Sequence, residues 1–215
     1  MAPSWSCAAP WPRLAPAHLA LGELRPRRRA ARTSASDRAQ AALEAAAAHL
    51  GRALELDPGL ALAWALRGDA QAARGEPELA FSDYARALAL DPARKETWLE
   101  RAILHAALGE PERAEHDLTE ALALDPGLAT AYWRRAAARG EQGDLAGALL
   151  DADNAVRLEP GGADALLTRA AVRRRAGDVA RAREDLAAAL AALPPDDPRA
   201  AALRTALGRE ALGRD

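Results

Sequence analysis

The residue types that could support catalysis are few and scattered in this sequence. The histidines (His18, His49, His105 and His116) fall at unrelated places, and the single cysteine, Cys7, joins none of them in a cluster. A metal site needs ligands gathered at a short, regular spacing, such as HExxH, and this sequence has no such spacing. We therefore expect no catalytic residues and no metal ligands.

Phosphate chemistry is not indicated either. The glycines do not form a phosphate-binding loop, because they recur singly between helical segments. Pairs of acidic residues are common, but at helical spacing they usually form solvated faces. We expect no bound cofactor, and we expect that the protein is not an enzyme.

The charge pattern argues against a nucleic-acid partner. The net charge is −2, yet residues 1–35 hold six arginines against one acid, Glu23. The rest of the chain carries 23 basic and 30 acidic residues, whereas binding to phosphates needs a basic stripe. No apolar run approaches the roughly 20 residues that span a bilayer. We expect a soluble protein without direct membrane insertion, most simply cytoplasmic.

The composition points to an all-α fold. Half of the 215 residues are hydrophobic, but only 4% are aromatic, and alanine and leucine supply most of the apolar content. Both are strong helix formers, and the β-branched residues that favour strands are scarce. The elements that position any functional residue are therefore helices.

Four sequence marks recur along the chain with one common period. The first is a Leu-Asp/Glu-Pro step that ends at Pro58, Pro92, Pro126 and Pro160. The second is a glycine followed by an acid, at Gly75, Gly109, Gly143 and Gly177. The other two are alanines, at Ala80, Ala114, Ala148 and Ala182, and at Ala87, Ala121, Ala155 and Ala189. Marks that keep one register indicate an internal repeat.

Each period predicts two helices joined by tight turns. Glycine suits the left-handed position that closes a helix, and the following acid suits an N-cap or first turn. Pro77 and Pro111 stand where the second helix should begin, which is the helical place that tolerates proline. The residue before the later proline is pushed out of the α region, so each second helix ends there.

These residues resemble the tetratricopeptide repeat family, whose consensus has a large residue at position 4, small residues at 8, 20 and 27, a bulky residue at 24 and proline at 32. Residues 61–94 offer Trp64, Gly68, Ala80, Tyr84, Ala87 and Pro92. Residues 95–128 offer Trp98, Ala102, Ala114, Leu118, Ala121 and Pro126. Residues 129–162 offer Tyr132, Ala136, Ala148, Ala152, Ala155 and Pro160, and residues 163–196 offer Leu166, Ala170, Ala182, Leu186, Ala189 and Pro194.

The resemblance implies a right-handed α-solenoid of stacked antiparallel helix pairs. It also shows departures: position 11, an aromatic in the family, is occupied by Gln71, His105, Arg139 and Arg173. We expect these residues, and the small Ala152 at position 24, to weaken local packing.

The ends of the array differ from the full repeats at 61–94, 95–128, 129–162 and 163–196. We predict a degenerate N-terminal repeat at 36–60, present only as a helix, and a capping helix at 197–215 with an apolar face of Ala202, Leu203, Ala206 and Leu207. Residues 1–35 are rich in proline, alanine and arginine and are expected to be disordered. They are a plain tail, an over-extended gene start or, less simply, a targeting segment.

In this family the first helix of each pair lines a concave groove, chiefly through positions 2, 5, 9, 12 and 13. The partner-binding residues expected on that basis are Leu62, Asp69, Leu99, Ile103, Trp133, Arg134, Leu167 and Arg174. Trp133 is the notable member, because Tyr132 already occupies position 4 and one residue turns a helix by about 100°. Trp133 then either faces the groove or packs between repeats.

The family's carboxylate clamp is not expected here. Chaperone-tail-binding members use lysine, asparagine and arginine at five positions, which this chain fills with Ala65, Asp69, Glu100, Thr130 and Arg134. Only Arg134 fits, and the two acids would repel a carboxylate. The resemblance implies a non-enzymatic scaffold that binds a partner's peptide or helix. The alternative is an assembly component that self-associates or docks to a membrane-associated complex, and the oligomeric state is left open.

Overall fold

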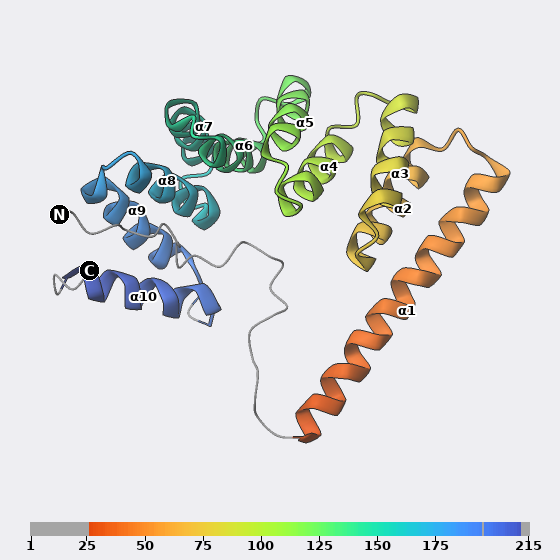
Figure 1. Ribbon diagram of the computed structural model, residues 1–215, viewed down its shortest axis with the longest axis horizontal. Helices are drawn as coiled ribbons and strands as arrows, with labels where there is room; N and C mark the ends of the chain where they lie inside the picture. Colours follow the sequence, from red (N-terminus) through yellow and green to blue (C-terminus); the bar gives the residue numbers. More distant parts are fainter. Residues whose placement is uncertain (1–25, 195, 212–215) are drawn as a thin grey trace, which may run out of the picture. The chain divides into compact units, whose positions relative to one another are not determined.

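The computed structural model describes residues 26–194 and 196–211, and this part of the chain is entirely helical between its turns (Figure 1). The helices in chain order are α1 (Pro26–Leu56), α2 (Ala61–Arg74), α3 (Pro77–Leu90), α4 (Lys95–Ala107), α5 (Pro111–Leu124), α6 (Ala129–Gln142), α7 (Leu145–Leu158), α8 (Ala163–Arg175), α9 (Val179–Ala192) and α10 (Pro198–Ala211). The chain divides into two compact parts at Gln40–Ala41, and the helix pairs all belong to the second.

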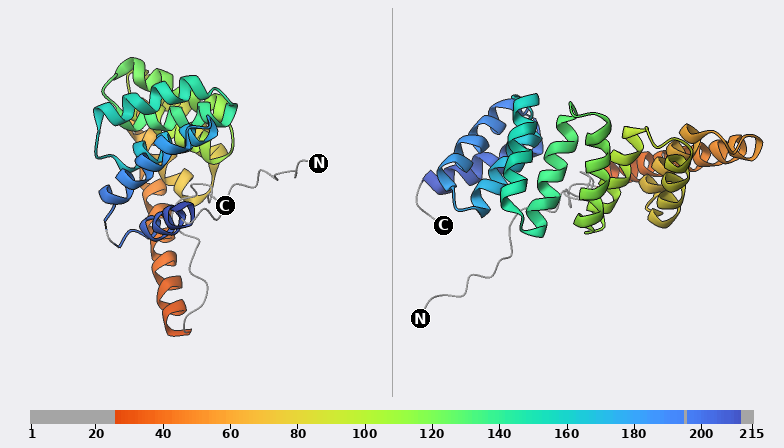
Figure 2. Two further views of the ribbon diagram at one scale, coloured as in Figure 1. Left: turned by 90° about the vertical axis from the view of Figure 1, so that its left-hand side faces the viewer. Right: turned by 90° about the horizontal axis from the view of Figure 1, so that it is seen from above.

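The second part is an all-α solenoid of helix pairs. α2 packs on α3, α4 on α5, α6 on α7 and α8 on α9, and each pair also contacts the next (Figure 2). The first helices of neighbouring pairs touch one another, as α2 with α4, α4 with α6 and α6 with α8. Since one pair cannot bury its apolar face alone, this stacking supplies the core.

The small residues that mark the repeat occupy the closest helix contacts. The alanines at positions 20 and 27 of the first three repeats are fully buried: Ala80, Ala87, Ala114, Ala121, Ala148 and Ala155. In the first repeat Gly68 lies so close to Tyr84 that an added Cβ would stand 2.8 Å from the aromatic ring. The prediction that small residues at these positions allow close approach of the helix axes is therefore confirmed.

Each full repeat also contains an ion pair that was not predicted from the sequence. An arginine at position 7 donates two hydrogen bonds to an aspartate at position 23, and we call each such pair an Arg–Asp rung. The rungs are Arg67–Asp83, Arg101–Asp117, Arg135–Asp151 and Arg169–Asp185, with N–O distances of 2.6–3.0 Å. The aspartate side chains are only 2–4% exposed. A planar guanidinium matches a carboxylate in this two-bonded way, which offsets the cost of burying the charge.

In the third and fourth full repeats, the residue at position 11 adds a second arginine to the rung. Arg139 donates to Asp151 at 2.9 Å and Arg173 donates to Asp185 at 2.8 Å, so both aspartates bind two arginines. His105 lies 3.8 Å from Asp117 in the same place. At the two arginines an ion pair stands where the family has an aromatic residue, and the expected weakening of local packing stays a prediction.

In the first two full repeats, the tryptophan at position 4 packs against the arginine of the rung. The guanidinium of Arg67 lies 4.7 Å above the ring of Trp64, and that of Arg101 lies 4.8 Å above Trp98. The two indole N–H groups donate to the carbonyls of Pro58 and Pro92 at 2.9 Å. Each tryptophan therefore ties the preceding turn to the Arg–Asp rung of its own repeat.

The glycines of the turns adopt the predicted conformation. Gly75, Gly109, Gly143 and Gly177 all have a positive φ, in the left-handed region that glycine alone adopts without strain. The acids that follow them behave in two ways. Asp144 and Asp178 accept a backbone hydrogen bond from the first turn of the next helix, whereas Glu76 and Glu110 make no such cap. The longer glutamates instead pair with Arg74 at 3.0 Å and His105 at 2.6 Å.

α1 begins earlier than the sequence predicted. Residues 26–35, expected to be disordered, continue the helix from Pro26, where proline occupies a first turn that tolerates it. The expectation for residues 1–25 lies outside the described residues. At the other end of α1, Leu54 is buried, but Ala46 is exposed although it stands at position 20. The equivalent alanines are buried against a first helix, which this degenerate repeat lacks.

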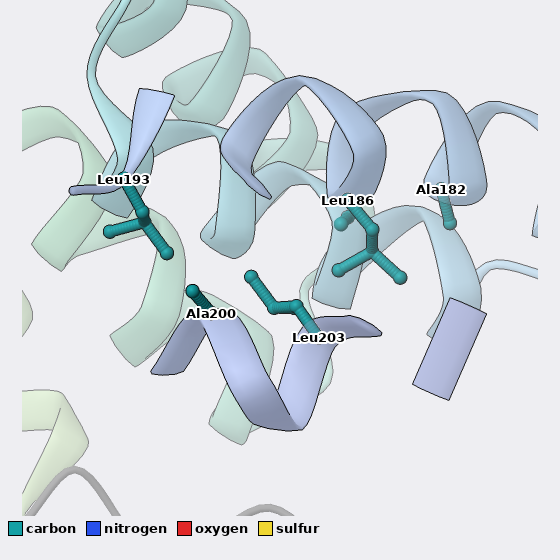
Figure 3. Close-up of a cluster of buried hydrophobic side chains, with 6 residues drawn as sticks. Ala182, Leu186, Leu193, Ala200 and Leu203 are labelled. Atoms are coloured by element: carbon teal, nitrogen blue, oxygen red, sulfur yellow. The ribbon is translucent and has the colours of Figure 1, made fainter. Parts of the chain in front are cut away.

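α10 closes the other end of the array. A cluster of Ala170, Ala182, Leu186, Leu193, Ala200 and Leu203 is at least nine-tenths buried, and Figure 3 shows Leu203 and Ala200 of α10 facing Leu186 and Leu193. Leu207 packs against it, but Ala202 is exposed, so its predicted place on the apolar face was wrong. The buried stripe runs 200–203–207 at helical spacing, which places residue 202 off it. The side chain of Ala206 lies outside the described residues.

Candidate functional site

The strongest candidate site is a pocket between the first helices of two neighbouring repeats. It has a volume of about 240 Å³ and lies between α2 and the start of α4. Its lining combines aliphatic side chains with charged ones: Leu62, Ala65, Leu66, Asp69, Arg94, Glu96, Thr97 and Glu100. Pockets with an apolar wall and a few placed polar groups are typical of binding sites.

Asp69 is fixed from behind by the core of its repeat. The hydroxyl of the buried Tyr84 donates to Asp69 Oδ1 at 2.8 Å. Burial raises the pKa of Asp69, and the hydrogen bond from Tyr84 and the nearby Arg94 partly oppose this. The carboxylate is therefore held in place by a neutral donor, and it lacks a close ion pair of the kind seen in the Arg–Asp rungs.

Glu100 faces the same pocket from α4. Loss of hydration raises the pKa of Glu100, the negative charge of Asp69 raises it further, and Arg134 on α6 opposes both effects. The negative charge of Asp69 makes ionisation of Glu100 less favourable, which shows that the two carboxylates lie in a region of negative potential. Such a site favours a cation or a hydrogen-bond donor over an anion.

Two polar groups at this site have no hydrogen-bond partner. The side chain of Thr97 belongs to a residue that is 2% exposed, and its hydroxyl oxygen Oγ1 is unbonded. The Nε of Arg94 is unbonded as well. Most buried polar groups in folded proteins are paired, so an exception indicates a ligand-facing position or a local cost in stability.

Arg134 and Trp133 form the next part of the surface, on α6. The Arg134 guanidinium lies 4.4 Å from the centre of the Trp133 ring, and both side chains are partly buried. Burial lowers the pKa of Arg134, while Glu100 and Asp164 act in the opposite direction. The carboxylates of α4 and α8 therefore flank one cation on α6.

The structure gathers some of the predicted groove residues and separates others. Leu62 and Asp69 line the α2–α4 pocket. Leu99 and Leu167 pack instead against clusters of buried core residues, and Ile103 is partly buried on α4. Arg174 is exposed near the end of α8. The assignment of all eight residues to partner binding stays a prediction.

The predicted partner-binding residues include only Leu62 and Asp69 of the eight residues that line the pocket. Arg94 directly precedes α4, and Thr97 lies in the first turn of that helix. Leu66 and Glu100 both stand at position 6 of their repeats. Position 6 entered the sequence-based expectations through Arg134 and through the carboxylate clamp. The available signal was the pair of acids, Asp69 and Glu100, which the chain places where that clamp would need positive or neutral groups.

A second cavity of about 300 Å³ belongs to the framework of the repeat. Arg101 and Asp117, which line it, form an Arg–Asp rung, and His105 is held between Glu110 and Asp117 with its ring stacked 4.3 Å from Phe81. These side chains already pair with one another, so we assign the cavity to the framework. Across residues 26–194 and 196–211 no cluster of three or more potential metal ligands occurs. In the same residues no helix is both long and apolar enough to cross a bilayer.

Comparison with known proteins agrees with this architecture. A family model described as Tetratricopeptide repeat matches residues 95–128. No curated protein matches the chain.

Several solved structures share the fold. MamA from Desulfovibrio magneticus RS-1 superposes with a TM-score of 0.67 at 19% identity, over 72% of this chain and 88% of that one. YrrB, described as a protein with an unusual peptide-binding site, gives 0.64 at 23% identity over 76% and 84%. The first repeat domain of Spaghetti (RPAP3), bound to an HSP90 peptide, gives 0.53 at 26% identity over 54% and 93%.

Proposed function

Because this chain is a tetratricopeptide repeat protein, we propose that it is a non-enzymatic scaffold that binds a peptide or helix of another protein along α2, α4, α6 and α8. The α2–α4 pocket is the observation that carries the proposal. The Spaghetti (RPAP3) domain has a peptide of HSP90 bound, which supports the same use of this fold here. Fold alone does not define function, so the proposal depends on the pocket itself.

The apolar wall of the pocket provides the sharpest test. Leu62 is 51% exposed on α2, whereas Leu150 is 64% exposed on α7, a second helix outside the pocket. We expect Leu62→Asn to abolish capture of partner proteins in a pull-down, while Leu150→Asn leaves capture unchanged. Since both leucines are exposed, neither change should unfold the array, and circular dichroism would check this. Equal capture by both variants would contradict the proposal.

Trp133 is tested separately. If it is a binding anchor, Trp133→Ala should reduce partner capture without lowering the free energy of unfolding, because anchors of this kind commonly dominate affinity. If it packs between α6 and α8, the same change should lower stability first. Measuring both quantities on one variant separates the two roles.

The alternative function, assembly through self-association, makes a different prediction. A self-associating array should show a mass that rises with protein concentration in light scattering. A mass equal to one chain at all concentrations would exclude it and leave the scaffold proposal in place.

A further inference from the structure

We infer that the α2–α4 pocket selects a basic side chain, arginine or lysine, from the bound partner. This inference rests on the proposed scaffold function and specifies what the scaffold recognises. Its basis is the combination of three acids, an aliphatic wall and an unsatisfied buried hydroxyl in one pocket.

The charges around the pocket favour a cation. Asp69, Glu96 and Glu100 contribute three carboxylates, and Arg94 contributes one positive charge. Asp69 is oriented by the Tyr84 hydroxyl, so it does not need to reorganise when a ligand arrives. A partner carboxylate would instead meet Asp69 and Glu100 directly, so the pocket disfavours an acidic side chain or chain end.

The apolar wall matches the rest of such a side chain. Leu62 and Leu66 are 51% and 44% exposed on α2, and they line the same pocket as the acids. Arginine and lysine carry three or four methylene groups below the charge, and these groups readily cover apolar surface. The pocket volume of about 240 Å³ accommodates one such side chain.

Thr97 supplies an independent indication of a ligand. Its side chain is almost fully buried and its hydroxyl oxygen has no hydrogen-bond partner. A hydroxyl oxygen can accept a hydrogen bond, and a guanidinium or ammonium group offers several N–H donors. A basic side chain would therefore satisfy Thr97 while its charge faces Asp69 and Glu100.

The test uses a small probe, so that the unknown partner is not required. N-acetyl-arginine methylamide is titrated into the full chain and followed by NMR of the backbone amides, with N-acetyl-citrulline methylamide as its neutral equivalent. We expect saturable shifts of residues in α2 and at the start of α4 with the arginine probe, and binding weaker by about tenfold or more with citrulline. Equal binding of the two probes would overturn the inference.

Two variants localise the effect. Glu100→Gln should weaken binding of the arginine probe by about tenfold, because it removes one charge from an exposed residue and keeps its shape. Glu120→Gln, an exposed acid on α5, should have no effect. Probe binding that is unchanged by Glu100→Gln would overturn the inference.

The same variants separate this inference from the proposed function. If Leu62→Asn abolishes partner capture but Glu100→Gln does not, the groove binds a partner without selecting a basic residue, and only the inference fails. If neither variant changes capture, the scaffold proposal fails as well.

Discussion

At the scale of single residues, the Arg–Asp rung is the feature with the highest cost of burial, because it places a carboxylate in the core. An aspartate at position 23 is almost fully buried in all four full repeats, and it is tolerated because the arginine at position 7 pairs with it through two hydrogen bonds. Both residue types recur in every full repeat, so the sequence contained this signal. Charges at helical spacing usually mean solvated faces, and periodicity alone does not distinguish such a face from a buried pair.

The number of arginines per rung predicts its contribution to stability. Asp151 binds Arg135 and Arg139, whereas Asp83 binds Arg67 and has Gln71 at position 11. We expect Asp151→Asn to lower the free energy of unfolding by about 2–3 kcal/mol, since it removes the carboxylate that two partly buried arginines share, and only Arg139 keeps another one, Glu115. Asp83→Asn should cost less.

Urea denaturation of both variants measures the difference. Glu141→Gln, an exposed acid on α6, provides the control and should leave the free energy of unfolding close to that of the wild type. Equal losses for Asp151→Asn and Asp83→Asn would show that the second arginine contributes nothing.

The raised pKa of Glu100 predicts a specific dependence of stability on pH. A carboxyl group whose pKa is higher in the folded than in the unfolded state favours folding when protonated, and this contribution is lost as pH rises through the folded pKa. The glutamine in Glu100→Gln is uncharged at every pH, so this variant keeps the favourable contribution of the uncharged side chain. The variant should therefore gain stability relative to the wild type as the pH rises above the ordinary pKa of glutamate.

Asp125 provides a comparison of opposite sign. Its hydrogen bond with Lys95, followed by one from the Gly127 N–H, lowers the pKa of Asp125, so its contribution is present at higher pH and lost as pH falls. The deficit of Asp125→Asn should be complete at neutral pH and shrink as the pH falls below the ordinary pKa of aspartate, whereas the gain of Glu100→Gln grows above the ordinary pKa of glutamate. Parallel trends for the two variants, followed by denaturation at each pH, would contradict this assignment.

At the scale of the elements, the turns show how far local sequence determines structure. The positions of Gly75, Gly109, Gly143 and Gly177 and of the N-terminal prolines predicted most helix ends closely, because left-handed closure and a proline first turn are local requirements. Side-chain capping was less predictable. Asp144 and Asp178 cap the next helix, while the one-methylene-longer Glu76 and Glu110 reach the side chains of Arg74 and His105 instead.

The glycine that closes α6 can be tested against a matched glycine nearby. Gly143 has φ of +89° and no neighbouring atom near an added Cβ. Gly143→Ala should therefore cost about 1–2 kcal/mol from backbone strain alone. Gly161 has equally open space and no such φ, and Gly161→Ala should be close to neutral. Thermal unfolding of the two variants isolates the conformational effect from packing.

At the scale of the whole array, the sequence predicted the solenoid better than the site. The fold follows from marks repeated in one register, such as the buried alanines at position 20, and repetition makes them easy to recognise. The residues of the pocket do not recur from repeat to repeat, since the positions of Asp69, Thr97 and Glu100 hold other residues elsewhere in the array. These three come together because α2 and α4 touch. Position 5 shows the same limit, since Leu99 and Leu167 turn partly into the core.

The end of the array should respond locally to a change in its cap. Leu203 is 1% exposed in the cluster between α9 and α10, and Leu203→Ala should cost about 2–4 kcal/mol. Because each repeat contacts only its neighbours, hydrogen exchange should accelerate mainly in α8, α9 and α10. The exposed Leu150→Ala on α7 should leave exchange unchanged. Faster exchange of equal size in α2 would show that the array unfolds as one unit.

The self-contained Arg–Asp rung has a consequence for how such a chain can change length during evolution. Both partners lie 16 residues apart within one period, so duplication or loss of a whole period carries both along. No copy inherits a buried aspartate whose arginine was left behind. A gene of this kind can therefore lengthen or shorten in steps of one period without creating an uncompensated charge, and each new copy remains free to acquire its own binding residues.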